Sequence, residues 1–410
     1  MSLRRAVALT SVATVFAALS VAARQPAQVS PETVGLSPAP LREATDLLKR
    51  YVAEQRMAGA VAAVARAGRI GYFETVGMQD LQARTPMSAR SLFRIYSMTR
   101  PITSVAVMML QEEGRFQLDD PVARFIPEFK NVVVAAAPGA TPHAPTRDVT
   151  VRDLLLHTAG LQPRTSEAYQ REHVRSREIT MAQFLANLVR VPLMEEPGTR
   201  YRYSEGTSVL GRLVEIWSGK PFEVFLDERI FRPLRMTDTM FWAGTPEQRA
   251  RLTTVYGPAP GGGLRPVETE TLPFTERPTL IEGAIGLLST VPDYLRFSQM
   301  LLNRGELDGV RLLQARTVGA MITNGLAEAV LKTRNGATGW GLANVDVQLN
   351  PPAGALEASG EFGWDGTAGT IFSVDPGRQS VMVLFTASQP SNPDQIRQRF
   401  KALVQQAIMN

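Results

Sequence analysis

The sequence contains no cysteine and only three histidines, His143, His157 and His173. The absence of cysteine excludes disulfides, thiolate zinc sites, iron–sulfur clusters and a cysteine nucleophile. The histidines are widely separated and lack the spacing of a metal site, so neither a metal nor any other cofactor is predicted. His157 lies in a leucine-rich segment, which favours a buried, hydrogen-bonded histidine over a catalytic one.

Several enzyme signatures are also missing. The chain has no G-x-S-x-G, H-E-x-x-H or P-loop pattern, which argues against an α/β-hydrolase nucleophile elbow, a zincin site and a phosphate-binding loop. A serine triad with a histidine base would have to use one of the three histidines. The remaining route to nucleophilic catalysis is a serine that is activated without histidine.

Blocks of basic residues are absent from the body of the chain. The 44 Lys and Arg residues exceed the 39 Asp and Glu residues only slightly, and the formal net charge is +5. Because a nucleic-acid surface needs clustered positive charge, no nucleic-acid partner is predicted. Hydrophobic residues make up 44% and charged residues 20% of the chain, which is typical of a folded globular protein.

The N-terminus has the pattern of a secretory signal. Arg4 and Arg5 precede an apolar run from Ala6 to about Ala23, and small residues follow it. Residues 1–27 are therefore predicted to be a cleaved signal peptide, which implies export to the periplasm or secretion. The alternative is a retained membrane anchor, but the many Ala and Ser residues make the run weakly hydrophobic. No later stretch is long and apolar enough to span a bilayer, so stable membrane insertion is not expected after cleavage.

Both ends of the chain combine predicted strands and helices. A helix is expected after the Ser37-Pro38 start, a hairpin over residues 60–76, strands at 370–374 and 380–387, and a last helix after Asn392. The second of the two late strands is apolar at every position, as expected for a strand that is covered on both faces.

The middle of the chain predicts short helices and loops. The Pro- and Gly-rich stretch 257–267 is expected to be a flexible loop. The predicted fold is α/β, with an antiparallel sheet flanked by helices and a mainly helical subdomain. The single domain would span 30–405, with its sheet part at about 30–115 and 281–410 and its helical part at about 116–280.

Ser97 lies at the start of a predicted helix that runs to Gly114. Arg100 should share a helix face with Ser97 because residues at i and i+3 are neighbours. Backbone N–H groups are free at a helix start, so the N–H of Ser97 could form half of an oxyanion hole. The pattern S-x-x-[KR] alone is weak evidence for a nucleophile, since a capping serine followed by an exposed arginine gives the same sequence pattern.

Five sequence blocks, which follow one another in a fixed order, strengthen the interpretation of Ser97 as a nucleophile. They closely resemble class C-type β-lactamases and the related esterases, including family VIII carboxylesterases, which are serine hydrolases with the penicillin-binding-protein fold. The resemblance covers roughly residues 35–405, and its blocks are 91–130, 151–161, 197–219, 285–309 and 362–376.

The resemblance assigns site residues. The family uses Ser-x-x-Lys, Tyr-x-Asn and a third, glycine-containing motif on a strand. Ser97 occupies the nucleophile position and Tyr203 the tyrosine position, while Trp364-Asp365-Gly366 occupies the third motif. By the same resemblance, the N–H of Thr367 would be the second oxyanion donor. The oxyanion and substrate pocket is predicted to include Gly366, Asp365, Trp364 and Tyr96 as well, and packing in the core or at the rim is the alternative role of Tyr96 and Trp364.

Two positions depart from the family pattern. Arg100 replaces the lysine and cannot act as a base, because a guanidinium keeps its proton. Glu205 replaces the asparagine. We hypothesise that Arg100 and Glu205 form a bidentate charge pair and that Tyr203 is the base, its phenolate favoured by the nearby guanidinium. Glu205 is the competing base, and Asp365 is an alternative partner of Arg100.

The resemblance implies acyl transfer through a covalent intermediate on Ser97, with small esters as the expected substrates and amides or β-lactams as further ones. One alternative is a weak or inactive relative that binds a ligand in the same cleft, because the motif lysine is missing. Another is a peptidoglycan D-amino peptidase that uses the same site.

Overall fold

The computed structural model describes residues 26–135, 141–334, 337–351 and 358–409. The predicted signal peptide, residues 1–27, lies almost wholly outside the described residues. Within the described ranges, no helix is both long and apolar enough to cross a membrane.

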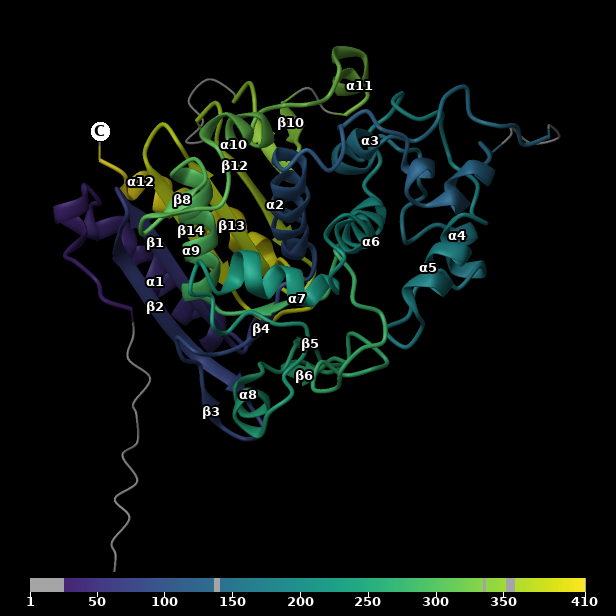
Figure 1. Cartoon of the computed structure of the whole chain (residues 1–410). Coiled ribbons are helices and arrows are strands. Elements are labelled where there is room, and N and C mark those ends of the chain that lie inside the picture. Colours follow the sequence, from purple (N-terminus) through teal and green to yellow (C-terminus); the bar gives the residue numbers. More distant parts are fainter. Residues whose placement is uncertain (1–25, 136–140, 335–336, 352–357, 410) are drawn as a thin grey trace, which may run out of the picture.

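An eight-stranded antiparallel sheet forms the centre of the molecule (Figure 1). The N-terminal hairpin pairs with a strand from the far end of the chain, so that Val61 lies opposite Phe385. The sheet is therefore completed by both ends of the sequence, and the predicted fold class is confirmed. In sheet order the strands are β10 (Thr338–Gly341), β11 (Val345–Gln348), β12 (Phe362–Gly366), β13 (Thr370–Asp375), β14 (Ser380–Phe385), β1 (Gly59–Arg66), β2 (Arg69–Asp80) and β3 (Thr85–Pro86).

The turn between β1 and β2 follows from its sequence. Ala67 and Gly68 both have positive φ, 49° and 75°, which matches the right-handed twist of a two-residue hairpin. On the other side of β1, every residue of β14 is buried, as the apolar pattern predicts for a strand covered on both faces.

Helices cover both faces of the sheet (Figure 1). One face packs against α1 (Pro38–Ala53) and α12 (Ile396–Ala407), whose apolar stripes join the alternate side chains of β1 and β2 in one core cluster. The other face packs against α9 (Val291–Leu302), and α2 (Thr99–Glu112) joins the same, larger cluster. Gly114, at φ 73°, follows the end of α2, as the predicted helix stop requires.

The predicted helical part, 116–280, contains short helices joined by loops. Its helix α6 packs directly on α2. The helices are α3 (Val151–Leu156), α4 (Glu167–Arg171), α5 (Met181–Leu188), α6 (Gly206–Ser218), α7 (Phe222–Leu226), continued by a π-turn at Asp227–Phe231, and α8 (Pro246–Arg251). Later in the chain follow α10 (Ala315–Met321) and α11 (Glu328–Lys332).

Three two-stranded pairs complete the fold: β4 (Phe93–Arg94) with β7 (Leu288–Ser289), β5 (Tyr256–Pro258) with β6 (Leu264–Pro266), and β8 (Glu306–Leu307) with β9 (Val310–Arg311). The second pair corrects the expectation of a flexible loop at 257–267. Two short strands pair there, and Gly261, Gly262 and Gly263, all at positive φ, form the connection between them.

Candidate active site

The turn that carries Ser97 joins β4 to α2. Residues Tyr96–Met98 form one 3-10 turn, and the α-helix begins at Thr99, two residues later than the predicted start. The hydroxyl of Thr99 accepts hydrogen bonds from the backbone N–H groups of Gly286 and Leu287, both at 3.2 Å, in the segment that leads into β7. The hydroxyl of Tyr294 donates to the carbonyl of Met98 at 2.9 Å. These bonds anchor the helix start on the core.

Tyr96, the residue before Ser97, has a strained backbone. Its φ is 42°, in the left-handed region that a bulky side chain rarely adopts, and such a residue costs about 1–3 kcal/mol. The side chain is buried and meets the ring of Phe274 edge-on, with centroids 6.0 Å apart. Strain of this size persists where the surroundings hold it, and here it lies next to the candidate nucleophile.

A cleft of about 680 Å³ opens beside the turn. The side chain of Ser97 is partly exposed and, within the described residues, its hydroxyl makes no hydrogen bond. Six of the nine predicted site residues line this cleft: Tyr96, Ser97, Arg100, Tyr203, Glu205 and Thr367.

Arg100 is buried, with 2% of its surface exposed, and it ties α2 to the start of α6. Its Nη1 donates to the carbonyl of Ser204 and to the hydroxyl of Thr207, both at 2.8 Å. Its guanidinium carbon lies 4.3 Å from the centre of the Tyr203 ring, a cation–π contact. Its Nε has no hydrogen-bond partner within the described residues.

The predicted pair between Arg100 and Glu205 is wrong. Glu205 is paired with Arg164, whose Nη2 lies 2.8 Å and whose Nε lies 2.9 Å from Oε1. The second carboxylate oxygen accepts from the hydroxyl of Ser208 at 3.1 Å. Arg100 does not form a bidentate fork with Glu205; its Nη1 instead donates to a backbone oxygen and a hydroxyl oxygen at the start of α6.

Glu205 belongs to a buried chain of charges behind the cleft. Ser208 also lies within hydrogen-bond distance of Glu282, whose carboxylate is paired with Arg175 at 2.6 Å. Arg175 in turn binds Glu270 at 2.7 Å. Burial opposes the charge on Glu205, but the guanidiniums of Arg164, Arg100 and Arg175 outweigh it and hold the pKa of Glu205 below its ordinary value. Glu205 is therefore a stably ionised, fully engaged carboxylate.

Tyr203 receives a hydrogen bond from the third motif. The indole N–H of Trp364 donates to the Tyr203 hydroxyl oxygen at 3.1 Å, and this leaves the phenol free to donate or lose its proton elsewhere. His157 lies beside the Tyr203 ring, with centroids 4.7 Å apart, and its Nδ1 accepts the N–H of Ser204 at 3.3 Å. Burial, reinforced by Arg100, lowers the pKa of His157 well below its ordinary value, which fits the predicted structural role.

Gly366 brings β12 against the nucleophile turn. A Cβ at Gly366 would lie 2.3 Å from the carbonyl oxygen of Ile95 and 2.3 Å from the hydroxyl of Thr370, so only glycine allows this approach. Thr367 follows directly, and it lines the same cleft as Ser97. Within the described residues the N–H of Thr367 makes no hydrogen bond, whereas its carbonyl accepts from the side chain of Gln389 at 2.8 Å.

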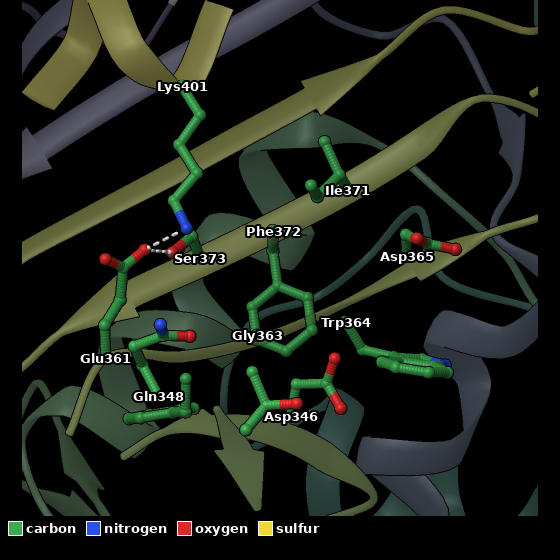
Figure 2. Close-up of a pocket in the computed structure, with 12 residues that line it drawn as sticks. Asp346, Gln348, Glu361, Gly363, Trp364, Asp365, Ile371, Phe372, Ser373 and Lys401 are labelled. Carbon is green, nitrogen blue, oxygen red and sulfur yellow. Dashed lines mark hydrogen bonds and ion pairs between the residues drawn. The ribbon is translucent and has the colours of Figure 1, made fainter. Parts of the chain in front are cut away.

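The three predicted pocket residues that do not line this cleft are Trp364, Asp365 and Gly366. Successive side chains of a strand point to opposite faces, so Asp365 points away from its neighbour Trp364. Its carboxylate pairs with Arg397 at 3.1 Å, which also excludes it as the partner of Arg100. Asp365 and Trp364 both border a smaller cavity of about 180 Å³, which Figure 2 shows.

Similarity to a known protein family bears on the role of this cleft. The sequence profile of the family described as "Beta-lactamase" matches residues 44–407. The chain belongs to the beta-lactamase family.

Curated relatives of this beta-lactamase-family chain include Protein Rv1367c of Mycobacterium tuberculosis (strain ATCC 25618 / H37Rv), which is 35% identical over 350 residues, 80% of this chain and 85% of the relative. Esterase EstB of Burkholderia gladioli is 29% identical over 378 residues, 85% of this chain and 91% of the esterase.

Solved structures show the same fold. EstCE1, described as a hydrolase with promiscuous acyltransferase activity, has a TM-score of 0.75 and 25% identity over 90% of this chain and 99% of its own. Simvastatin synthase (LovD) of Aspergillus terreus has a TM-score of 0.77 and 22% identity over 89% of this chain and 97% of its own, which supports the fold alone.

Sequence reasoning missed two arginines that complete the site. Arg164 lies outside the five blocks, and no local pattern marks it as the partner of a carboxylate 41 residues away. Arg397 lies in α12, where the sequence pattern marks only an apolar stripe, and its hydrogen bond to Gly366 spans 31 residues. The only available signal was the replacement of an amide by Glu205, since a buried carboxylate needs a cationic partner.

Proposed function

We propose that this chain is a serine esterase that hydrolyses small esters through an acyl-enzyme on Ser97. The observation that carries the proposal is the shared cleft, which Ser97, Thr367 and Tyr203 all line. Among the residues that the structure describes, the hydroxyl of Ser97 and the N–H of Thr367 have no hydrogen-bond partner. The likeness to EstB and to EstCE1, both described as hydrolases or esterases, supports an ester as the substrate.

The proposed reaction has two steps. Ser97 Oγ attacks the ester carbonyl while its proton passes to Tyr203, and the tetrahedral oxyanion is bound by the N–H groups of Ser97 and Thr367. Tyr203 then returns the proton to the departing alcohol, and an ester bond to Ser97 remains. In the second step water attacks that ester and the same tyrosine takes a proton from the water. The bond to Ser97 Oγ then breaks, Tyr203 returns the proton to Ser97 Oγ, and the carboxylic acid leaves.

The site favours Tyr203 over Glu205 as the base. Both oxygens of Glu205 are engaged, by Arg164 and Ser208, and its lowered pKa makes it a poor proton acceptor. The hydroxyl oxygen of Tyr203 accepts the Trp364 N–H, its ring faces the Arg100 guanidinium, and the residue lines the same cleft as Ser97. Arg100 would thus supply charge to the site, where the family's lysine supplies an amine.

The test is labelling of Ser97 by a fluorophosphonate probe, read by intact mass. We expect one adduct on the wild type and none on Ser97→Ala. Hydrolysis of p-nitrophenyl esters should be lost in Tyr203→Phe and retained in part by Glu205→Gln. A wild-type chain that forms no adduct, under conditions that label an active esterase, contradicts the proposal and favours a ligand-binding protein. Side-by-side assays with a chromogenic β-lactam and a D-alanyl peptide distinguish the related activities.

We also propose that the chain is exported. The proposal rests on the charged and apolar pattern of residues 1–27. Fractionation of an expressing bacterium, with N-terminal sequencing of the mature chain, tests it; a chain that retains Met1 in the cytosolic fraction contradicts it.

A further inference from the structure

The peptide group between Gly366 and Thr367 joins the candidate oxyanion hole to the far side of the sheet. A trans peptide is planar, and its C=O and N–H point in opposite directions. The N–H of this peptide is that of Thr367, which lines the cleft, whereas the C=O is that of Gly366. Whatever binds that carbonyl therefore sets the direction of the N–H.

Arg397 binds that carbonyl. Its Nη2 donates to the Gly366 oxygen at 2.5 Å, and its Nη1 lies 3.1 Å from the carboxylate of Asp365. The N–H of Gly369 donates to the same carbonyl at 3.1 Å. Arg397 is 5% exposed, so its charge acts on the carbonyl with little screening by solvent.

A cation on the carbonyl has two effects on the opposite end of the peptide. It holds the peptide plane in one orientation, and it draws electrons toward the oxygen, which makes the N–H a stronger donor because linked hydrogen bonds polarise one another. Asp365 keeps Arg397 in place, which gives a role to the one third-motif residue that turns away from the cleft.

We propose that Arg397 is a positioning residue for acyl transfer: by binding the Gly366 carbonyl, it orients and polarises the Gly366–Thr367 peptide, whose N–H stabilises the oxyanion. The proposal rests on the proposed esterase function. Arg397 itself does not touch the substrate and acts through the peptide.

The same helix provides a matched control. Lys401 lies one turn after Arg397 on α12, and its ammonium binds Glu361, the residue before β12, at 2.7 Å. Figure 2 shows Lys401 reaching from the helix to Glu361, with Asp365 farther along the strand. Both side chains join α12 to β12, but only Arg397 reaches the end that carries Thr367.

The experiment compares Arg397→Met, Arg397→Lys and Lys401→Met with the wild type. Acylation is measured with a p-nitrophenyl ester, and the stretching frequency of the acyl-enzyme carbonyl is measured by infrared difference spectroscopy with an isotope-labelled acyl group. We expect Arg397→Met to acylate about 10- to 100-fold more slowly, as for a weakened oxyanion donor. Its acyl carbonyl should absorb at a higher frequency, because a weaker donor polarises it less. Lys401→Met should stay within about threefold. Arg397→Lys should recover only part of the loss, since it keeps the charge but lacks the two-nitrogen fork that binds Gly366 and Asp365 together.

The outcomes separate the two proposals. A wild type that forms no acyl-enzyme overturns the esterase function and, with it, the role of Arg397. A wild type that acylates, together with an Arg397→Met enzyme that has an unshifted carbonyl frequency, overturns the role of Arg397 alone, whatever its rate, because a purely structural loss would not change the polarisation. Circular dichroism checks folding. If Arg397→Met does not fold, Arg397→Gln takes its place as the neutral variant, and the same frequency comparison decides.

Discussion

Arg164 approaches Glu205 to 2.8 Å, and with this contact a loop of the helical part is tied to the start of α6, directly behind Tyr203. The side chain of Glu205 is 2% exposed and that of Arg164 is 34% exposed, so the pair lies at the wall of the cleft with its anionic partner buried. It explains how a carboxylate can occupy the position of a neutral amide in the family motif. The buried charge is compensated, but by a residue of a different segment.

Replacing Glu205 tests this pair. Glu205→Gln should destabilise the fold by about 1–3 kcal/mol, because it leaves Arg164 without its partner. In a double-mutant cycle with Arg164→Met, the combined loss should be smaller than the sum of the single losses. Urea unfolding measures it, and strictly additive losses would show that the two residues do not interact.

The stability from Glu205 should depend on pH. Its pKa is lowered in the folded state, so the carboxylate binds protons less readily there than in the unfolded chain. The stabilising contribution is complete above the ordinary value of 4.5 and declines as the pH falls through the lower, folded value. The stability difference between wild type and Glu205→Gln should therefore be constant near neutral pH and shrink in acid. A difference that grows in acid would contradict the lowered pKa.

The positive charge of Arg100, rather than any single hydrogen bond that it makes, should be what the reaction requires. Arg100→Met removes the charge next to Ser97 and Tyr203, and we expect hydrolysis of p-nitrophenyl esters to fall about 100-fold. Arg100→Lys keeps a positive charge and should stay within about tenfold of the wild type. Thr207→Val, which removes one acceptor of Arg100 but leaves its charge, is the control. Equal activity of Arg100→Met and wild type would eliminate charge as the contribution of this residue.

Gly366 should tolerate no side chain. In Gly366→Ala the new Cβ would meet the Ile95 carbonyl at 2.3 Å, which forces β12 away from the nucleophile turn. We expect at least about a 100-fold loss of esterase activity, as for removal of an oxyanion donor, with the fold retained. Gly319→Ala is the control, because Gly319 has no positive φ and no atom lies within 4 Å of a Cβ at that position. An active Gly366→Ala enzyme would mean that the strand can retreat without harm to the site.

Asp293, in the first turn of α9, predicts a second effect of pH on stability. Burial raises its pKa to about 7, although the N–H of Asp238 and the hydroxyl of Thr239 bind the carboxylate. The folded protein then holds a proton that the unfolded chain releases near 3.8, so stability falls as the pH rises from about 4 to about 7. Asp293→Asn should remove this part of the slope, and it should become relatively more stable than the wild type as the pH rises. Thermal unfolding at several pH values measures it, and parallel curves would refute the assignment.

Much of the site could be predicted because its motifs are local. Short sequence patterns mark the turn at Ser97, the tyrosine Tyr203 and the strand that ends at Gly366. Their order along the chain matches that of the family, which predicts that they lie together in the folded protein. The structure brings Ser97, Tyr203 and Thr367 to one cleft. The charge partners could not be predicted in this way. A salt bridge depends on the path of two distant segments, and several arginines and carboxylates have the right chemistry for each other.

The sequence by itself determined the elements and the fold class, because apolar periodicity, glycines at positive φ and helix starts depend on neighbouring residues. It also determined which side chains could act as nucleophile and base. Only the tertiary structure decided which groups pair: Glu205 with Arg164, Asp365 with Arg397, and Arg100 with the oxygens at the start of α6. The reason is physical. Burial makes an unpaired charge costly, so each ionised group binds whichever opposite charge or polar oxygen the packing brings within reach, and that choice is made in three dimensions.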